Sequence, residues 1–369
     1  MKLEKGKITA AQLLFTTACF IQSSALLSAF LSGVVGYDSW FVVVVAIVLC
    51  LPILMVYIGL TKMYPGKNLV EINDLAFGKV LGKVVSFCHV LFFLTLAALN
   101  LRDLSVFVKQ TIMDKTPDVV LSAVCVLVSA LAVRYGLSVV TRFAFLFVLI
   151  SAAVLTSSLF FASNQMDLNN FLPMLQQPVK TYVQGVNIAL SIPFAELVVF
   201  LMILPYVREK KRSVGRYFVG GFLLGGVTFL LVVFRDTAVL GNTLSLFALP
   251  AYETLRLIKL FGTLSRLEIL FAVVLIILLF FKISILHYAT SLSAAQLFGM
   301  KSYKPVVLAI GVLMIGYGFT LYPSSVQHAD SGRETAAILW QFFELILPLL
   351  ALVIGKIRKG KSTTKEASG

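Results

Sequence analysis

The sequence predicts an all-α integral membrane protein with ten transmembrane helices, arranged as two inverted halves in which the first and sixth helices are broken. Its 369 residues are 59% hydrophobic and only 13% charged, and the mean hydropathy is +0.96. A soluble domain usually holds about a quarter charged residues, so a lipid bilayer is the expected surrounding. Because no polar stretch is long enough for a separate domain, residues 1–369 are expected to form one transmembrane domain.

Ten apolar runs are long enough to cross a bilayer as helices, which takes about 20 residues. Pro65-Gly66 marks a turn between the second and third runs, and a short amphipathic helix is expected after it. A helical hairpin is expected within residues 240–265, either as a lid or as simple packing. The ten spans are expected at roughly 9–32, 40–61, 84–108, 118–135, 139–162, 181–207, 215–239, 266–298, 303–322 and 335–357.

The basic residues indicate the orientation of the chain. If ten spans alternate, about two thirds of the 31 lysines and arginines lie on one side, including those of the tail at 358–369. Lysine and arginine concentrate in cytoplasmic loops, so both termini are expected in the cytoplasm. The formal charge of +14 therefore indicates topology in a lipid bilayer rather than nucleic-acid binding.

Ten spans divide into two halves of five, at about 7–162 and 180–357. An odd number of spans in each half makes the second half enter the membrane in the opposite sense, which is the arithmetic of an inverted repeat. Substrate sites in such folds form where broken helices from the two halves face one another.

The sixth span carries Pro193 and Glu196 near its centre. Proline lacks an N–H group and its ring clashes with the preceding turn, so the helix should kink or break there. An ionised carboxylate at the midplane costs about 3 kcal/mol on the lenient insertion scale. Both are tolerated where the freed backbone groups line a cavity or are buried in protein. We interpret this segment as part of a binding site; a kinked structural helix with Glu196 bonded to a neighbour is the alternative.

The first span has a matching polar interruption, Gln22-Ser23-Ser24. Serine hydroxyls bond the backbone and help to bend a helix, although small polar residues also serve close helix packing. Because the interruptions of spans one and six stand at matching positions in the two halves, we interpret this polar run as functional.

Ionisable residues within spans are functional candidates by default. Lys282, in the middle of span eight, is too deep to reach either surface, and Glu196 is its natural partner. A structural ion pair is the alternative to a coupling role.

Four further polar residues within spans complete the candidate set for charge or coupling. His287, over one turn after Lys282, is a candidate for the same path. A structural role is favoured for the polar residues of span three, which are Asn100, Arg102 and Asp103.

The sequence shows no phosphate loop, nucleophile elbow or metal-ligand spacing. All four cysteines fall within apolar spans, so neither a disulfide nor a metal site is expected, and no cofactor is implied. An enzyme is the least expected function.

Several short motifs carry a resemblance to a known family over residues 7 to 357. The sequence resembles the spore germination permeases, the B subunits of nutrient germinant receptors, within the amino acid–polyamine–organocation superfamily. The motifs are Lys7-Ile8-Thr9-Ala10-Ala11-Gln12-Leu13, Asp38-Ser39-Trp40, Tyr64-Pro65-Gly66-Lys67, Leu249-Pro250-Ala251-Tyr252-Glu253 and Arg266-Leu267-Glu268.

The resemblance implies a leucine-transporter-like fold in the spore inner membrane, which is the cell membrane of the forespore. It also implies a complex with A and C subunits and binding of a small nutrient, typically an amino acid, that triggers germination. Relatives often have glycine at the first break, where this chain has Gln22-Ser23-Ser24. Carried over by position, the ligand pocket lies between Gln22, Ser23, Ser24 and Ala25 and the facing Ser191, Ile192, Pro193 and Phe194.

Two alternative functions stay open on the sequence. One is an amino acid transporter coupled to protons through Glu196 or Lys282, and the other is an ion or water conduit of the germination complex. Sodium-coupled members of the superfamily hold a cation between spans one and eight, so Lys282 is a candidate for a fixed charge near that position.

Overall fold

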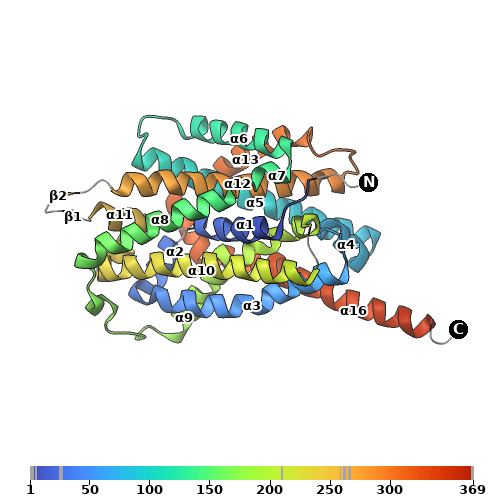
Figure 1. The fold of residues 1–369 in the computed structure, drawn as a ribbon, viewed down its shortest axis with the longest axis horizontal. Coiled ribbons are helices and arrows are strands. Elements are labelled where there is room, and N and C mark those ends of the chain that lie inside the picture. Colours follow the sequence, from blue (N-terminus) through green and yellow to red (C-terminus); the bar gives the residue numbers. More distant parts are fainter. Residues whose placement is uncertain are drawn as a thin grey trace.

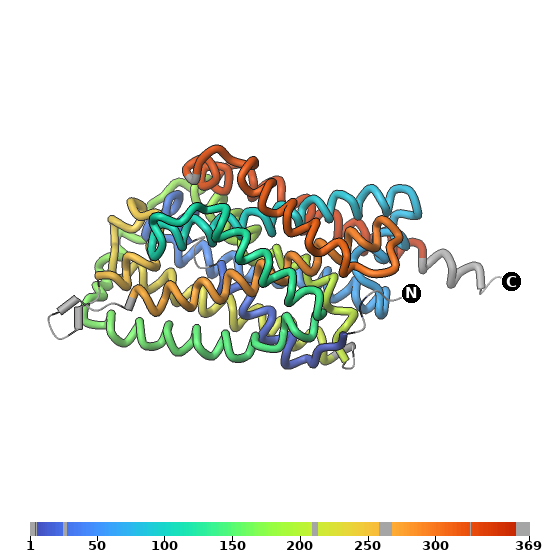
Figure 2. Tube along the Cα trace, turned by 90° about the horizontal axis from the view of Figure 1, so that it is seen from above, coloured from blue at the N-terminus to red at the C-terminus, as the bar shows by residue number. Residues whose placement is uncertain are grey.

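The computed structural model is an elongated helical bundle whose long helices run roughly along one axis (Figures 1 and 2). Helix α4 and helix α16 lie at one end of the bundle, and α11 lies at the other (Figure 1). The structure describes residues 4, 6–24, 28–208, 211–257, 259–260, 263–264 and 267–366.

The helices of the two halves follow one another along the chain; η5, η9 and η10 are π-helical turns, and the remaining η elements are 3-10 helices. The first half contains α1 (Ala10–Gln22), α2 (Ser28–Val35), η2 (Gly36–Asp38), α3 (Ser39–Met63), α4 (Leu69–Phe77), α5 (Lys79–Thr111), α6 (Asp118–Tyr135), α7 (Leu137–Val140), α8 (Ala144–Ala162), η3 (Ser163–Gln165) and η4 (Leu168–Phe171). The second half contains α9 (Val179–Ala189), η5 (Leu190–Phe194), η6 (Ala195–Met202), η7 (Leu204–Tyr206), α10 (Lys211–Leu240), η8 (Gly241–Leu246), α11 (Pro250–Arg256), β1 (Lys259–Leu260), β2 (Thr263–Leu264), α12 (Leu267–Leu297), α13 (Val306–Leu321), α14 (Ser325–Ser331), η9 (Gly332–Ala336), α15 (Ala337–Gln341), η10 (Phe342–Ile346) and α16 (Leu347–Glu366).

The described residues account for the ten predicted spans. Eight segments are long and apolar enough to cross a membrane, and α1 and α13 are shorter apolar helices. Helix α1 is short because span one is interrupted after Gln22. The second part of that span, α2, continues through η2 into α3 without a gap. These three elements therefore form one of the eight long segments, Ser28–Met63. The prediction of a ten-helix membrane protein is confirmed.

The two predicted segments outside the spans have different outcomes. The amphipathic helix is confirmed as α4, which starts at a capping box in which Asn68 and Glu71 each accept a backbone N–H of the other, at 3.2 and 3.1 Å. The prediction of a helical hairpin at 240–265 is wrong in part, because the helical elements η8 and α11 are followed by two short antiparallel strands, β1 and β2.

Helices α1 and α10 pack so closely that glycine is required between them. A Cβ atom on Gly221 would lie 2.3 Å from the Leu14 carbonyl oxygen, and one on Gly225 would lie 2.8 Å from the Ile21 side chain. Small residues let transmembrane helices approach at the backbone. Span seven therefore holds the first half of span one in place.

The segment before α1 ties three parts of the chain together. The Ile8 N–H donates to the Tyr206 carbonyl at 3.1 Å, and the Arg208 N–H donates to the Ile8 carbonyl at 2.9 Å. The buried Glu4 carboxylate accepts the Tyr303 hydroxyl at 2.9 Å and the Leu137 N–H at 3.4 Å. This segment thus joins span six to α7 and to the loop before α13.

Tyr303→Phe is expected to loosen this N-terminal segment. The change removes a donor from a buried carboxylate, and a hydrogen bond to a charged group contributes about 1.5–3 kcal/mol. Hydrogen exchange at the Ile8 amide should therefore become about tenfold faster or more. Tyr317→Phe, on the more exposed α13 surface, serves as the control. Unchanged exchange at Ile8 in Tyr303→Phe would contradict this role for Glu4.

Candidate functional site

Span six is interrupted at the predicted place. Helix α9 ends at Ala189, Ile192 leaves the helical conformation with φ −121° and ψ 103°, and the chain resumes as a 3-10 helix from Ala195. Proline at position 193 cannot donate to the preceding turn, so backbone carbonyls are freed there. The Tyr57 hydroxyl lies between two backbone carbonyls, 3.1 Å from that of Ala195 and 2.6 Å from that of Glu344. The break is thereby stabilised by α3, which the sequence analysis did not anticipate.

Span one is interrupted as well. Helix α1 ends at Gln22, Ser23 and Ser24 form a 3-10 turn, and α2 begins at Ser28. The Ser23 hydroxyl donates to the Phe20 carbonyl at 2.6 Å and so bonds its own helix. Ala25, which was assigned to the ligand pocket by resemblance, lies outside the described residues.

Lys282 of α12 links the two breaks. Its ammonium nitrogen lies 2.6 Å from a carboxylate oxygen of Glu196, donates to the Ser24 hydroxyl at 2.8 Å, and sits 5.0 Å from the centre of the Phe20 ring. The side chains of Lys282 and Glu196 are 0% and 1% exposed. A buried ion pair is favourable only with close geometry and further partners, and Ser24 and Phe20 supply these. The predicted pairing of Glu196 with Lys282 is present.

Glu344 of η10 belongs to the same cluster and was missed by the sequence analysis. Its side chain is fully buried and close enough to Glu196 and Lys282 to interact electrostatically with both. Within the described part of the chain, neither carboxyl oxygen has a hydrogen-bond partner. Glu344 is the one acidic residue in the apolar run of span ten, at 335–357. Because ionisable residues within membrane spans are functional candidates by default, the sequence alone could have identified it.

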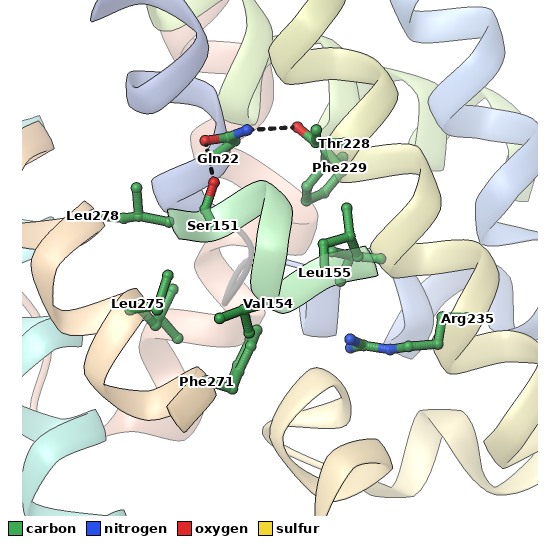
Figure 3. Close-up of a pocket in the computed structure, with 12 residues that line it drawn as sticks. Gln22, Ser151, Val154, Leu155, Thr228, Phe229, Arg235, Phe271, Leu275 and Leu278 are labelled. Carbon is green, nitrogen blue, oxygen red and sulfur yellow. Dashed lines mark hydrogen bonds between the residues drawn. The ribbon is translucent and has the colours of Figure 1, made fainter. Parts of the chain in front are cut away.

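Gln22 turns away from span six. Its amide donates to the Thr228 hydroxyl at 3.2 Å and accepts from Ser151 at 2.8 Å, so it joins α10 to α8 (Figure 3). These residues border an apolar cavity of about 50 Å³, where Arg235 also lies, held by its neighbour Asp236 at 2.7 Å. The expectation that Gln22 faces span six is therefore corrected: its amide satisfies hydroxyl groups of spans five and seven.

The side chains at the break of span six also point to other helices. The Ser191 hydroxyl donates to the Ala337 carbonyl at 2.7 Å in span ten. The Phe194 ring packs edge-on against Phe222 and Phe229 of span seven, with ring centres 5.4 and 6.2 Å apart. Ser191 therefore bonds to span ten, and Phe194 packs on span seven. Ile192 and Pro193 are buried, and ligand contact by them stays a prediction.

The polar residues of span three bond away from the Lys282 cluster. Asn100 donates to the Leu96 carbonyl of its own helix at 2.8 Å. Arg102 donates to the Gly318 carbonyl at 3.2 Å near the end of α13, and Asp103 pairs with His328 at 3.2 Å. Arg102 and Asp103 have separate partners, as expected for adjacent residues on a helix.

His287 bonds to spans four and nine, and a role on the same path as Lys282 stays a prediction. One ring nitrogen lies 2.9 Å from the Ser129 hydroxyl of α6, and the other lies 2.8 Å from the Val307 carbonyl of α13. Positions five apart on a helix point about 140° from each other, so His287 faces spans four and nine. In this structure it joins those spans.

Comparison with known proteins identifies the family. The family model described as "Spore germination protein" matches residues 7–326. The chain belongs to this family. Spore germination protein KB of Bacillus subtilis (strain 168) is 28% identical over 99% of this chain and 100% of that protein. Spore germination protein A2 of the same organism is 24% identical over 82% of each.

The solved structures that resemble this member of the family are transporters. A nucleobase-cation-symport-1 family transporter, closed with bromovinylhydantoin bound, matches with a TM-score of 0.67 and 13% identity over 92% of this chain and 79% of that one. A Na⁺-coupled sialic acid symporter matches with a TM-score of 0.68 and 12% identity over 95% of this chain and 90% of that one. These likenesses concern the fold, which is leucine-transporter-like as predicted, and the chain is an integral membrane protein.

Proposed function

We propose that this chain is the B subunit of a nutrient germinant receptor, which binds a small nutrient at the two helix breaks and triggers spore germination. Membership in the spore germination family and the transporter fold support a sensing or permease role. An amino acid is the proposed ligand class, since the site combines buried carboxylates, an ammonium group and hydroxyl groups.

The observation that carries the proposal is the bridge that Lys282 makes between Ser24 and Glu196. It connects the interrupted helices of the two halves through one buried side chain. A ligand shifts a conformational equilibrium only if its contacts differ between the states. A ligand that bonds to Ser24 or Glu196 competes with Lys282, so binding would change how the halves are linked.

The setting of the receptor is part of the proposal. The receptor is placed in the spore inner membrane with A and C subunits, and both termini are assigned to the cytoplasm. The loop charges and the common end shared by α4 and α16 support this orientation (Figure 1). In this proposal the chain forms one transmembrane domain of two halves, about 7–162 and 180–357, and residues 358–369 are a basic cytoplasmic tail.

Glu196→Gln tests the proposed site. Spores carrying the parent gene or the variant are exposed to single nutrients, and receptor abundance is measured by immunoblot. Because a bond to a charged group contributes about 1.5–3 kcal/mol, the response to the effective nutrient, divided by receptor abundance, should fall about tenfold or more. Glu334→Gln, on an exposed position of η9, is the matched control. A parental response in Glu196→Gln would remove the helix breaks as the recognition site.

A proton-coupled amino acid transporter is the second candidate, favoured by the buried Lys282–Glu196 pair and by the transporter fold. Uptake of the effective amino acid into proteoliposomes separates the two. A transporter should accumulate the amino acid inside the vesicles under an inward proton gradient, and this accumulation should disappear when an uncoupler collapses the gradient. A sensor should bind the amino acid without accumulating it.

A further inference from the structure

Glu344 is a buried carboxyl group without a hydrogen-bond partner among the described residues. It lies in η10, which packs against η6, α15, α16 and α5. Its backbone carbonyl accepts the Tyr57 hydroxyl at 2.6 Å, so the segment is fixed while the side chain is left without a partner. Buried polar groups are hydrogen-bonded in the great majority of cases. The way in which this unpartnered carboxyl group is stabilised therefore needs a chemical explanation.

The titratable groups around Glu344 come from several elements. Glu196 of η6 and Lys282 of α12 interact with it electrostatically, as do Tyr57 and Cys50 of α3. From α5, the His89 ring packs against the neighbouring Phe343 and bonds the Val85 carbonyl. The sequence of α15 contributes no titratable residue. Among the described side chains, Lys282 is the cation that acts on Glu344.

The charges of this cluster do not balance if both carboxylates are ionised. Lys282 already forms a 2.6 Å pair with Glu196. An ionised Glu344 would leave one negative charge unmatched within the membrane, where isolated charges are strongly disfavoured. One additional positive charge, either a proton or a cationic group, makes the cluster neutral.

Without a bound ligand, the side chains that surround Glu344 leave a proton as the source of this positive charge. Lys282 is the cation that acts on Glu344 among the described side chains, and its ammonium group is already paired with Glu196 at 2.6 Å. The Ser191 hydroxyl near the Glu344 carboxyl donates to the Ala337 carbonyl at 2.7 Å and carries no charge.

We propose that Glu344 is protonated in this conformation and receives the ammonium group of an amine-bearing ligand, so that binding at the helix breaks releases one proton. The ligand half of this proposal rests on the proposed function. The step is an exchange: the ligand ammonium pairs with the Glu344 carboxylate, and the carboxyl proton passes to the solvent. The charges of Lys282, Glu196 and Glu344 sum to zero before the step, and they do so again afterwards when the ligand ammonium is included. The carboxylate of an amino acid ligand lies outside this sum and is assigned to the end of a broken helix, where folds of this kind bind anionic substrate groups.

Infrared spectroscopy of the purified full-length protein without ligand tests the protonation. The parent should show the C=O stretch of a protonated carboxyl, and Glu344→Gln should lose that band. Glu334→Gln, at an exposed glutamate ten residues earlier, should keep it. Equal melting temperatures and elution volumes would show that the nearly isosteric variant is folded. A parent spectrum without the band, or a band that survives in Glu344→Gln, would overturn the protonation.

Calorimetric titration tests the exchange with L-alanine, L-valine and L-leucine, each beside the carboxylic acid that lacks its amine. Heats measured in two buffers of different ionisation enthalpy give the number of protons released. The parent should release about one proton per bound amino acid, whereas the acids without an amine should release none. Residual binding by Glu344→Gln should release none. A parent that binds without release contradicts the exchange. Absence of binding by all three amino acids overturns the ligand half together with the proposed function, while the infrared result separately decides the protonation.

Discussion

Lys282→Met is expected to lower both the abundance of the protein and its melting temperature in detergent. The substitution leaves Glu196 buried without its cation and removes the donor to Ser24. Breaking a buried pair on one side costs about 3–5 kcal/mol, because the remaining charge is uncompensated. Lys304→Met, at an exposed loop position, should leave both quantities at the parental level.

The double variant Lys282→Met/Glu196→Gln separates the cost of the stranded charge from the cost of the lost bridge. Replacing both partners of a buried pair by neutral groups is often close to neutral for stability. The double variant should therefore recover most of the abundance and the melting temperature, but not the nutrient response. If Lys282→Met alone keeps the parental abundance and response, Lys282 does not link the two breaks.

Gly221→Leu is expected to destabilise the bundle by disrupting the contact of α1 with α10. Even the first side-chain atom would lie 2.3 Å from the Leu14 carbonyl oxygen, a backbone atom that cannot move alone. Overpacking typically costs about 1–3 kcal/mol where side chains can adjust, and here a whole helix must shift. The melting temperature and the yield of monodisperse protein should both fall.

Gly316→Leu is the matched control, because an added Cβ there meets nothing within 4 Å. Both glycines lie inside apolar helices, so any gain in helix propensity is shared. Equal losses in the two variants would show that the effect comes from the helix sequence and not from the α1–α10 contact.

Much of the fold was predictable because membrane insertion leaves strong local signals. Length, apolar runs and loop charges depend on the sequence alone, and they gave the ten spans. The breaks were predictable from Pro193 and from the run of polar residues at Gln22, since each disturbs a helix locally. The region after η8 was less predictable, because short strands in a loop depend on the rest of the bundle.

The directions of side chains at the site were not predictable in the same way. Gln22, Ser191 and Phe194 sit at the breaks, yet their partners come from spans five, seven and ten. An interrupted helix loses the regular 100° step between residues, so the sequence period no longer tells which neighbour a side chain meets. Glu196 and Lys282 were easier to pair because an isolated charge in a membrane needs an opposite charge.

The proposed nutrient site lies where Lys282 links the two breaks. Its most direct test is equilibrium binding of the radiolabelled amino acid that triggers germination, measured on purified parent protein and on Glu196→Gln. Saturable binding is expected for the parent, and at least about tenfold weaker binding for the folded variant, whose melting temperature should be lower because Lys282 is left without its anion. Equal affinities in the two folded proteins would contradict this site and would place nutrient recognition elsewhere in the receptor.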